Sequence, residues 1–290
     1  MRKSFSYYLV LAILKLKNVK KIYKSNPIDI QAVRKDDIKS PKDPFYSGNN
    51  VLKFSLSQTN ITAINNPNSQ KLILYLPGGA YVSGPAKHHW DTIKTIYKST
   101  HQNIWVLDYP KAPKYKIEQI QDSILKVYKK ALSQYNPHKI VIMGDSAGAS
   151  LALCLKQLLI NHNLSLPIKT IAICPVIDPT MTNPNIKPLE KSDPILAING
   201  VLSAKKMCAK DLSSPLIAPQ SLPLTTFKDT VFFLAQNDIM YPDAIKLTNQ
   251  LKQQNINHQV IIGQGMPHIW PILPIMSESK KAIKQIIAHL

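Results

Sequence analysis

A serine flanked by small residues stands where an apolar segment meets a helix-like one. Residues 139–143 are mostly apolar, Gly144-Asp145-Ser146-Ala147-Gly148 follows, and residues 150–160 have the composition of a helix. A sharp strand-to-helix turn strains the backbone of its central residue, so the residues two positions away must be small, as both glycines are. Such a turn exposes the Ser146 hydroxyl and aims the Ala147 amide at the reacting oxygen. The segment therefore predicts a nucleophilic serine.

A serine nucleophile needs a general base, and the base needs a carboxylate that orients it. The apolar run 231–235 is followed by Asp238, and the run 259–262 is followed by a glycine-rich loop that carries His268. An acid and then a histidine, each after a strand and both C-terminal to the serine, is the required order. We therefore expect Ser146, Asp238 and His268 to form the catalytic triad.

Other acids and histidines fit these roles less well. Asp243 is better placed to stabilise the first turn of a helix, and Asp229 precedes its strand rather than following it. The other seven histidines lie at helix or strand ends. His88 and His89 suggest a metal, but adjacent side chains rarely chelate one ion. We expect no metal and no cofactor.

A second glycine-rich segment precedes the serine. The apolar run 71–76 leads into Pro77-Gly78-Gly79-Ala80, and two glycines allow a backbone to approach a substrate oxygen closely. Together with the amide of Ala147, the amides of Gly78, Gly79 and Ala80 are the expected oxyanion hole.

Bulky side chains close to these positions in sequence are candidates for a compact apolar substrate pocket, which Tyr7, Tyr8 and Leu11 could close. The alternative is that several of them are core residues. The pocket candidates are Tyr81, Val82, Ile239, Met240, Ile269 and Trp270.

Continuously apolar runs alternate with helix-like segments over most of the chain. Such runs predict strands buried on both faces, which implies a doubly wound, mostly parallel α/β sheet in a single domain, residues 1–290. The expected strands are 51–56, 61–64, 71–76, 104–107, 140–143, 170–174, 231–235 and 259–262. The expected helices are 88–99, 117–135, 147–160, 243–254 and 277–289.

Two segments lie outside this alternation and are expected to form a small helical cap, residues 1–47 and about 179–215. Residues 4–24 read as one basic amphipathic helix that covers the site mouth, with contact to a lipid surface as the less favoured alternative. Residues 25–47 are polar and proline-rich, which is typical of a linker. The insertion should pack with the N-terminal helix over the carboxyl edge of the sheet.

The chain carries a net charge of +19 over 290 residues, 44% of which are hydrophobic. The lysines are spread along the sequence and accompany no nucleic-acid motif, so we expect no nucleic-acid partner. Cys154, Cys174 and Cys208 form an odd, scattered set; Cys154 and Cys174 fit buried, reduced core residues, which suits a cytoplasmic location.

These motifs resemble those of the hormone-sensitive-lipase-like branch of the α/β-hydrolase fold. The elbow 144–148 matches that family's Gly-Asp-Ser-Ala-Gly completely, and residues 108–113 resemble its Tyr-Arg-Leu-Ala-Pro-Glu stretch. Further likenesses are Pro175-Val176-Ile177-Asp178, Ser213-Ser214-Pro215-Leu216, Leu222-Pro223, Gln236-Asn237-Asp238 and Pro267-His268. The resemblance implies a serine carboxylesterase acting on small, uncharged acyl esters.

One motif departs from the family pattern. The family's oxyanion motif is His-Gly-Gly-Gly, whereas Pro77 and Ala80 stand at its first and last places here. Some relatives with an altered motif became receptors, so the alternatives to an esterase are a ligand-binding protein without turnover and an interfacial lipid-ester hydrolase. The sequence leaves the natural ester and the oligomeric state open.

Overall fold

The structure is a computed structural model that describes residues 3–290. One sheet of eight strands runs through the molecule in the order β1-β2-β4-β3-β5-β6-β7-β8. The strands are β1 (Val51–Leu56), β2 (Thr59–Ile64), β3 (Leu72–Leu76), β4 (Asn103–Asp108), β5 (Ile140–Asp145), β6 (Lys169–Ile173), β7 (Thr230–Ala235) and β8 (His258–Gly263). The helices are α1 (Phe5–Leu16), α2 (Val19–Ile22), α3 (Ile30–Arg34), α4 (Lys87–Thr100), α5 (Ile117–Leu132), α6 (Ala147–Asn161), α7 (Ile186–Glu190), α8 (Ile198–Cys208), α9 (Tyr241–Gln253) and α10 (Ser277–Ala288).

The sheet is parallel except at one strand. β2 pairs antiparallel with both of its neighbours, β1 and β4, whereas every pair from β4 through β3 to β8 is parallel. Each strand overlaps the segment expected for it, so the prediction of a mostly parallel α/β sheet is confirmed.

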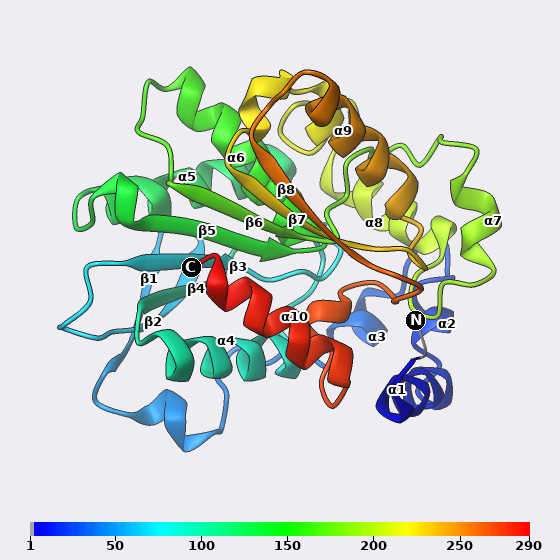
Figure 1. The fold of residues 1–290 in the computed structure, drawn as a ribbon, viewed down its shortest axis with the longest axis horizontal. Helices are drawn as coiled ribbons and strands as arrows, with labels where there is room; N and C mark the ends of the chain where they lie inside the picture. The colour runs from blue at the N-terminus through cyan, green and yellow to red at the C-terminus, as the bar shows by residue number, and fades with distance from the viewer. Residues whose placement is uncertain (1–2) are drawn as a thin grey trace.

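Helices cover both faces of the sheet, which explains the continuous apolar runs. Figure 1 shows α5, α6 and α9 above the sheet and α4 and α10 below it. Along β3, Ile73 and Tyr75 pack into the core on the α4–α10 side, while Leu72, Leu74 and Leu76 pack on the other side. Because side chains alternate between the faces of a strand, both sets must be apolar.

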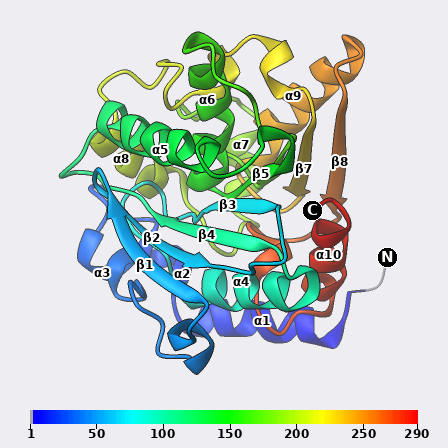
Figure 2. The same ribbon diagram turned by 90° about the vertical axis from the view of Figure 1, so that its left-hand side faces the viewer.

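The N-terminal segment differs from the expected single helix over residues 4–24. Helix α1 ends at Leu16, Asn18 adopts a left-handed conformation with φ of 50°, and α2 starts at Val19. Asparagine tolerates this conformation better than most residues, which makes it a suitable break point. Figure 2 shows α1 running beneath α10. Within residues 3–290, no helix has the length and apolar character to cross a bilayer.

Residues 25–47 are more ordered than a linker. They contain α3, whose first turn is capped by the Asp29 carboxylate accepting from the Ala32 amide, and a 3₁₀ turn at Pro44–Ser47. Ile28 and Tyr46 are buried. Enough apolar surface is therefore present to order the segment against the body of the protein.

The two segments expected to form the cap contact one another. The Lys20 ammonium donates to the Asp193 carbonyl at 2.7 Å, and the Ile28 amide donates to the Ser203 hydroxyl at 3.0 Å. Gly200 lies so close to the Tyr23 carbonyl that a Cβ there would come within 1.9 Å of the oxygen. Figure 1 shows α1–α3, α7 and α8 gathered at one end of the sheet. Their assignment as a cap on a single domain stays a prediction.

Candidate active site

Ser146 forms the turn between β5 and α6. Its φ of 51° and ψ of −125° are the strained angles expected of a nucleophile elbow, and its amide donates to the Ile173 carbonyl at 2.8 Å. A Cβ on Gly148 would approach the Leu76 carbonyl oxygen to 2.0 Å, and one on Gly144 would approach Gly148 to 2.6 Å. The turn therefore requires both glycines.

The structure brings Ser146, His268 and Asp238 into one hydrogen-bonded chain. His268 Nε2 lies 2.9 Å from Ser146 Oγ, and His268 Nδ1 lies 2.6 Å from Asp238 Oδ2. The Met240 amide donates to Asp238 Oδ1 at 2.9 Å, so the acid is held on both oxygens. The competing acids lie in other contacts: Asp243 accepts from Asn183, and Asp229 accepts from Asn257.

The surroundings of His268 favour its protonated form. Burial lowers the pKa of His268, but the adjacent Asp238 carboxylate outweighs burial, so the pKa lies above its ordinary value. Asp193 and Asp145 act in the same direction. A base that gains affinity for a proton in this way can take one from a hydroxyl and return it to a leaving group.

Cys154 and Cys174 are free and buried, as predicted, and Cys208 is free and buried as well. The Cys174 sulfur lies within 4.8 Å of ligand atoms of Asp238 and His268. Burial and the Asp238 charge raise the pKa of the Cys174 thiol well above its usual range. The thiol therefore stays protonated and is a poor nucleophile.

Asp193 is a second buried carboxylate at this site, and sequence reasoning missed it. Its Oδ1 accepts from the amides of Ile195 and Leu196 at 2.8 Å each, and its Oδ2 accepts from the Ile239 amide at 3.0 Å. Burial and the Asp238 charge raise the pKa of Asp193 to about 6. Asp193 thus joins the 179–215 insertion to Ile239, the residue after Asp238.

Of the three amides expected from the loop after β3, two make no hydrogen bond within the described residues. The Gly78 amide donates to Asp145 Oδ1 at 3.1 Å and is therefore already engaged, so its expected role as an oxyanion donor stays a prediction. A Cβ on Gly78 would lie 2.4 Å from Asp145 Oδ2 and 3.0 Å from Ser146 Cβ. Within residues 3–290 the amides of Gly79, Ala80 and Ala147 make no hydrogen bond, which leaves them available.

The Asp145 carboxylate holds this loop in place through hydrogen bonds. It accepts from the Tyr75 hydroxyl at 2.6 Å as well as from Gly78, and it lies 3.3 Å from His89 Nε2. His89 Nδ1 accepts from the Ala86 amide, so Nε2 carries the proton and donates to Asp145. Burial raises the pKa of Asp145, but His89 and Tyr75 together bring it below its ordinary value. Sequence reasoning treated His89 as a polar helix end and missed this role.

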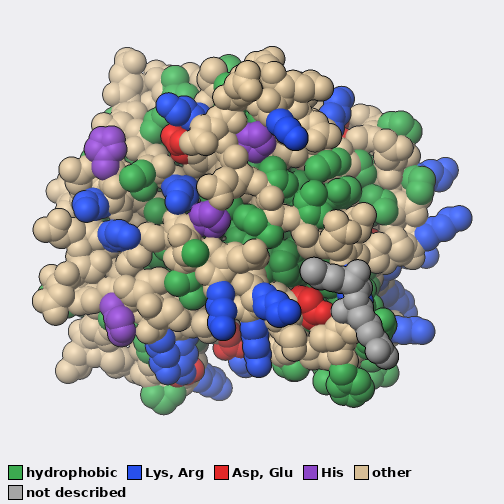
Figure 3. Space-filling view, viewed as in Figure 1, with side chains coloured by type: hydrophobic (Ala, Val, Ile, Leu, Met, Phe, Trp, Pro, Cys, Tyr) green, Lys and Arg blue, Asp and Glu red, His purple; other side chains and the backbone are tan. Residues whose placement is uncertain are grey.

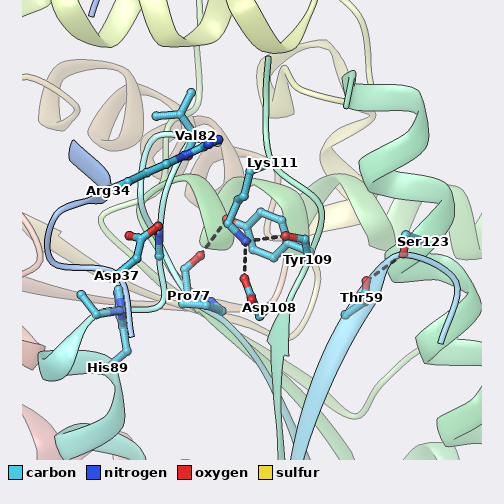
Figure 4. Close-up of polar contacts among 12 residues, drawn as sticks. Arg34, Asp37, Thr59, Pro77, Val82, His89, Asp108, Tyr109, Lys111 and Ser123 are labelled. Carbon is cyan, nitrogen blue, oxygen red and sulfur yellow. Dashed lines mark hydrogen bonds and ion pairs between the residues drawn. The ribbon is translucent and has the colours of Figure 1, made fainter. Parts of the chain in front are cut away.

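Contacts from other parts of the chain hold the loop at its two ends. The Tyr109 hydroxyl donates to the Pro77 carbonyl at 2.7 Å, and Lys111 lies over the Tyr109 ring at 3.6 Å from its centroid (Figure 4). Arg34 Nε donates to the Val82 carbonyl at 2.7 Å, and the Gly84 amide donates to Asp37 Oδ1 at 2.7 Å. Arg34 and Asp37 come from the segment expected to be a linker.

The six pocket candidates do not form one group. Tyr81 and Val82 belong to the core on the α5–α6 side, and the others contact the core on the α4–α10 side. Trp270 packs against Gly263 and donates to the Leu234 carbonyl at 3.2 Å, so it is a core residue. Ile239 and Met240 directly follow Asp238 and are buried, and Ile269 follows His268 with a left-handed φ of 51°.

Five buried side-chain polar atoms among the described residues find no hydrogen-bond partner, and the Tyr81 hydroxyl and the Lys205 ammonium are two of them. Burial lowers the pKa of Lys205 to about 7, although the charges of Asp178, Asp243 and Asp238 oppose this. Lys205 lies on the buried side of α8, and no sequence pattern identified it.

The prediction that no metal binds stays a prediction. The ligand atoms of His88, His89 and Asp145 lie within 4.8 Å of one another, so the structure supplies a third donor that sequence spacing did not reveal. The Asp145 oxygens already accept from Tyr75, Gly78 and His89. This donor set is therefore hydrogen-bonded without an ion.

Sequence comparison points to one family. A family model described as alpha/beta hydrolase fold matches residues 73–272. An esterase of Acinetobacter venetianus is 26% identical over 200 residues, which cover 68% of this chain and 66% of that protein. The carboxylesterase/phospholipase LipF of Mycobacterium tuberculosis is 26% identical over 230 residues, which cover 74% of this chain and 60% of that protein. The chain thus spans 60% and 66% of the length of these two relatives.

Solved structures give the same fold. A crystal structure of a candidate esterase from Staphylococcus aureus superposes with a TM-score of 0.82 at 27% identity, over 96% of this chain and 97% of that one. An esterase of the bacterial hormone-sensitive lipase family superposes with a TM-score of 0.81 at 22% identity, over 99% and 98% of the two chains. At 22% identity, the second likeness shows the fold alone.

Proposed function

The chain belongs to the α/β-hydrolase fold family, and on that premise we propose that it is a serine carboxylesterase that hydrolyses small, short-chain acyl esters. The observation that carries the proposal is the chain of contacts from Ser146 through His268 to Asp238, with distances of 2.9 and 2.6 Å. The esterase and carboxylesterase names of its relatives support the same class of reaction.

In the proposed first step, Ser146 Oγ attacks the ester carbonyl carbon while its proton passes to His268 Nε2. Asp238 accepts from Nδ1 and stabilises the imidazolium that forms. Negative charge then develops on the carbonyl oxygen, where the free amides of Gly79, Ala80 and Ala147 can donate to it. One such donor typically lowers the barrier by about 3 kcal/mol.

The tetrahedral intermediate collapses when the bond to the leaving oxygen breaks and His268 gives its proton to that oxygen. The alcohol departs and leaves an acyl group on Ser146. Water repeats the sequence: His268 takes a proton from the water as its oxygen attacks the acyl carbon, and then returns the proton to Ser146 Oγ. The products are one carboxylic acid and one alcohol.

The preference for short acyl chains rests on packing. Tyr81 and Val82, which follow the loop after β3, and Ile239 and Met240, which follow Asp238, are all buried and bulky. A pocket enclosed by such side chains accepts a few methylene groups before it must open.

Hydrolysis of p-nitrophenyl esters from acetate to dodecanoate tests this function, with Ser146→Ala as the matched control. We expect the highest kcat/KM on the short esters and a loss of at least 1,000-fold, on the order of the effect of removing a nucleophile, in Ser146→Ala. A fluorophosphonate probe should label the wild type and not the variant. If neither protein turns over any ester and neither is labelled, the proposal is wrong and the chain is a binding protein on this fold.

A further inference from the structure

Helix α1 exposes an unusual amount of apolar surface. Among the described residues, nine large apolar side chains are exposed, and four of them lie on this one helix. Their exposed fractions are 85% for Phe5, 59% for Tyr8, 41% for Leu9 and 82% for Leu16. Single exposed apolar residues are ordinary, but a cluster on one helix marks an interaction surface.

These four side chains share one side of the helix. With Ala12, which is also exposed, positions 5, 9, 12 and 16 follow helical spacing, while Tyr7 and Val10 point into the core. The exposed Ile275 lies two residues before Ser277, whose hydroxyl is 3.0 Å from that of Ser6. We call Phe5, Tyr8, Leu9, Ala12 and Leu16 the α1 face; Figure 3 shows apolar side chains gathered in this region, at the lower right.

The segment that carries the α1 face is itself positively charged. Residues 3–24 contain six lysines and no acidic residue. Lys15, Lys17, Lys21 and Lys24 are exposed, and none of them forms a salt bridge within the described residues. An apolar stripe with a lysine border combines the two features that bind a helix to an anionic bilayer surface.

We propose that the α1 face docks on an anionic lipid bilayer, with Phe5, Leu9 and Leu16 inserted at the headgroup boundary and the bordering lysines paired with lipid phosphates. The interaction is peripheral: the helix lies in the plane of the surface and does not span it. The proposal is independent of the proposed esterase activity, because it concerns binding and not turnover.

Charge and apolar exposure together favour a lipid bilayer over a second copy of the chain or a nucleic acid as the ligand of the α1 face. In a two-fold dimer, the same face meets itself, so the lysines of one copy would oppose those of the other with no acid in residues 3–24 to pair with them. A nucleic acid would satisfy the lysines but would leave the exposed Phe5 and Leu16 without an apolar partner. An anionic bilayer satisfies both.

The helix is fixed to the body of the protein near the proposed catalytic base. The Tyr7 hydroxyl donates to the Gly265 carbonyl at 3.0 Å, and the Ser4 hydroxyl donates to Glu278 at 2.7 Å. Gly265 lies three residues before His268, in the same loop. A molecule docked through the α1 face would therefore hold the loop that carries His268 near the lipid surface.

Co-sedimentation with vesicles tests the proposal. The full chain carries Ser146→Ala, which prevents any lipid hydrolysis. It is mixed with vesicles of phosphatidylcholine alone, or of phosphatidylcholine with roughly 30% phosphatidylglycerol to imitate an anionic leaflet. We expect binding to the anionic vesicles that weakens as salt is added, and little binding to the neutral ones. The Phe5→Ser/Leu16→Ser double variant should lose tenfold or more in partition coefficient, which is about 1.4 kcal/mol or more.

The lysine contribution has its own variant and control. Lys15→Gln/Lys17→Gln/Lys21→Gln should weaken binding by about 100-fold, or about fivefold for each lysine. Lys129→Gln/Lys130→Gln/Lys252→Gln makes the same change in net charge at exposed positions far along the chain and should bind as before. Leu52→Ser, at a 57% exposed side chain on β1, is the control for apolar exposure.

Three results would overturn the proposal. The first is no binding of the parent protein to anionic vesicles. The second is equal loss of binding in the α1 variants and their controls, which would place the attraction in the overall charge. The third is a concentration-dependent dimer, seen by sedimentation velocity, that the Phe5→Ser/Leu16→Ser variant abolishes while vesicle binding is absent. Hydrolysis of p-nitrophenyl acetate by the α1 variants should stay within about twofold of wild type (less than 0.5 kcal/mol) and reports separately on the proposed function.

Discussion

Gly78→Ala tests whether the loop after β3 must press against the elbow for catalysis. A Cβ at position 78 would lie 2.4 Å from Asp145 Oδ2, 2.9 Å from the Asp145 carbonyl oxygen and 3.0 Å from Ser146 Cβ. Ordinary van der Waals contact begins at 3.4 Å, so the loop and the Asp145 carboxylate must separate by about 1 Å. The Asp145 carboxylate has little freedom to retreat, because Tyr75 and His89 also hold it.

A displacement of about 1 Å at a catalytic group costs about 100-fold in rate, or about 2.7 kcal/mol of barrier. Since the amides of Gly79 and Ala80 follow Gly78 directly, we expect kcat on p-nitrophenyl butyrate to fall by about 100-fold with KM within about threefold of wild type. Gly48→Ala is the control, because a Cβ there meets only the flexible Asn50 side chain within 3.4 Å. A folded Gly78→Ala protein with kcat within threefold of wild type would refute the reasoning.

Two further predictions concern buried ionisable groups. Asp193→Asn places a side-chain amide where the Ile239 N–H now finds a carboxylate oxygen, so the free energy of unfolding should fall by about 1–3 kcal/mol. The Asp193 charge helps to raise the pKa of His268, so the acid limb of the kcat/KM profile should lie above pH 6.5 in wild type and move to lower pH in Asp193→Asn. If the limb does not move, Asp193 acts only by holding the structure together. Lys205→Met removes a lysine whose pKa is about 7 in the folded protein and 10.5 in the unfolded chain. The lysine therefore lowers the free energy of unfolding increasingly as the pH falls below 10.5, and this loss reaches its full size below about pH 7. The variant should therefore be more stable than wild type in urea melts, by roughly 3 kcal/mol more at pH 6 than at pH 9, and an equal gain at both pH values would contradict the assigned pKa.

The strands of the sheet could be predicted because their burial is visible in a few consecutive residues. A strand covered on both faces is apolar along most of its length, and β3, residues 140–143 of β5 and residues 231–235 of β7 are unbroken apolar runs. The elbow could be predicted for the same reason, since a tight turn requires Gly144 and Gly148 within a few residues of the serine it strains.

The supports of the site could not be predicted, because they come from distant segments with no local signature. Asp193 reaches the acid loop from the insertion, His89 reaches Asp145 from α4, and Arg34 reaches Val82 from a segment that reads as a linker. Only Arg34 had a usable signal nearby: Asp29 is a helix N-cap residue five positions earlier. Periodicity describes which face of an element is buried, but it does not say which remote side chain will meet it.

Pro77 is the departure from the family motif that bears most on catalysis, and its surroundings explain why the loop can tolerate it. Proline has no amide to donate, yet the amides available for an oxyanion all lie at later positions, on Gly79, Ala80 and Ala147. The carbonyl of Pro77 is fixed by the Tyr109 hydroxyl, and the next amide, that of Gly78, is fixed by Asp145. The loop is thus restrained on both sides of the peptide bond that follows the proline. A side chain at position 77 is not required to hold it, and the hydrogen bonds that support it are formed by Tyr109, Asp145 and, through Asp145, His89.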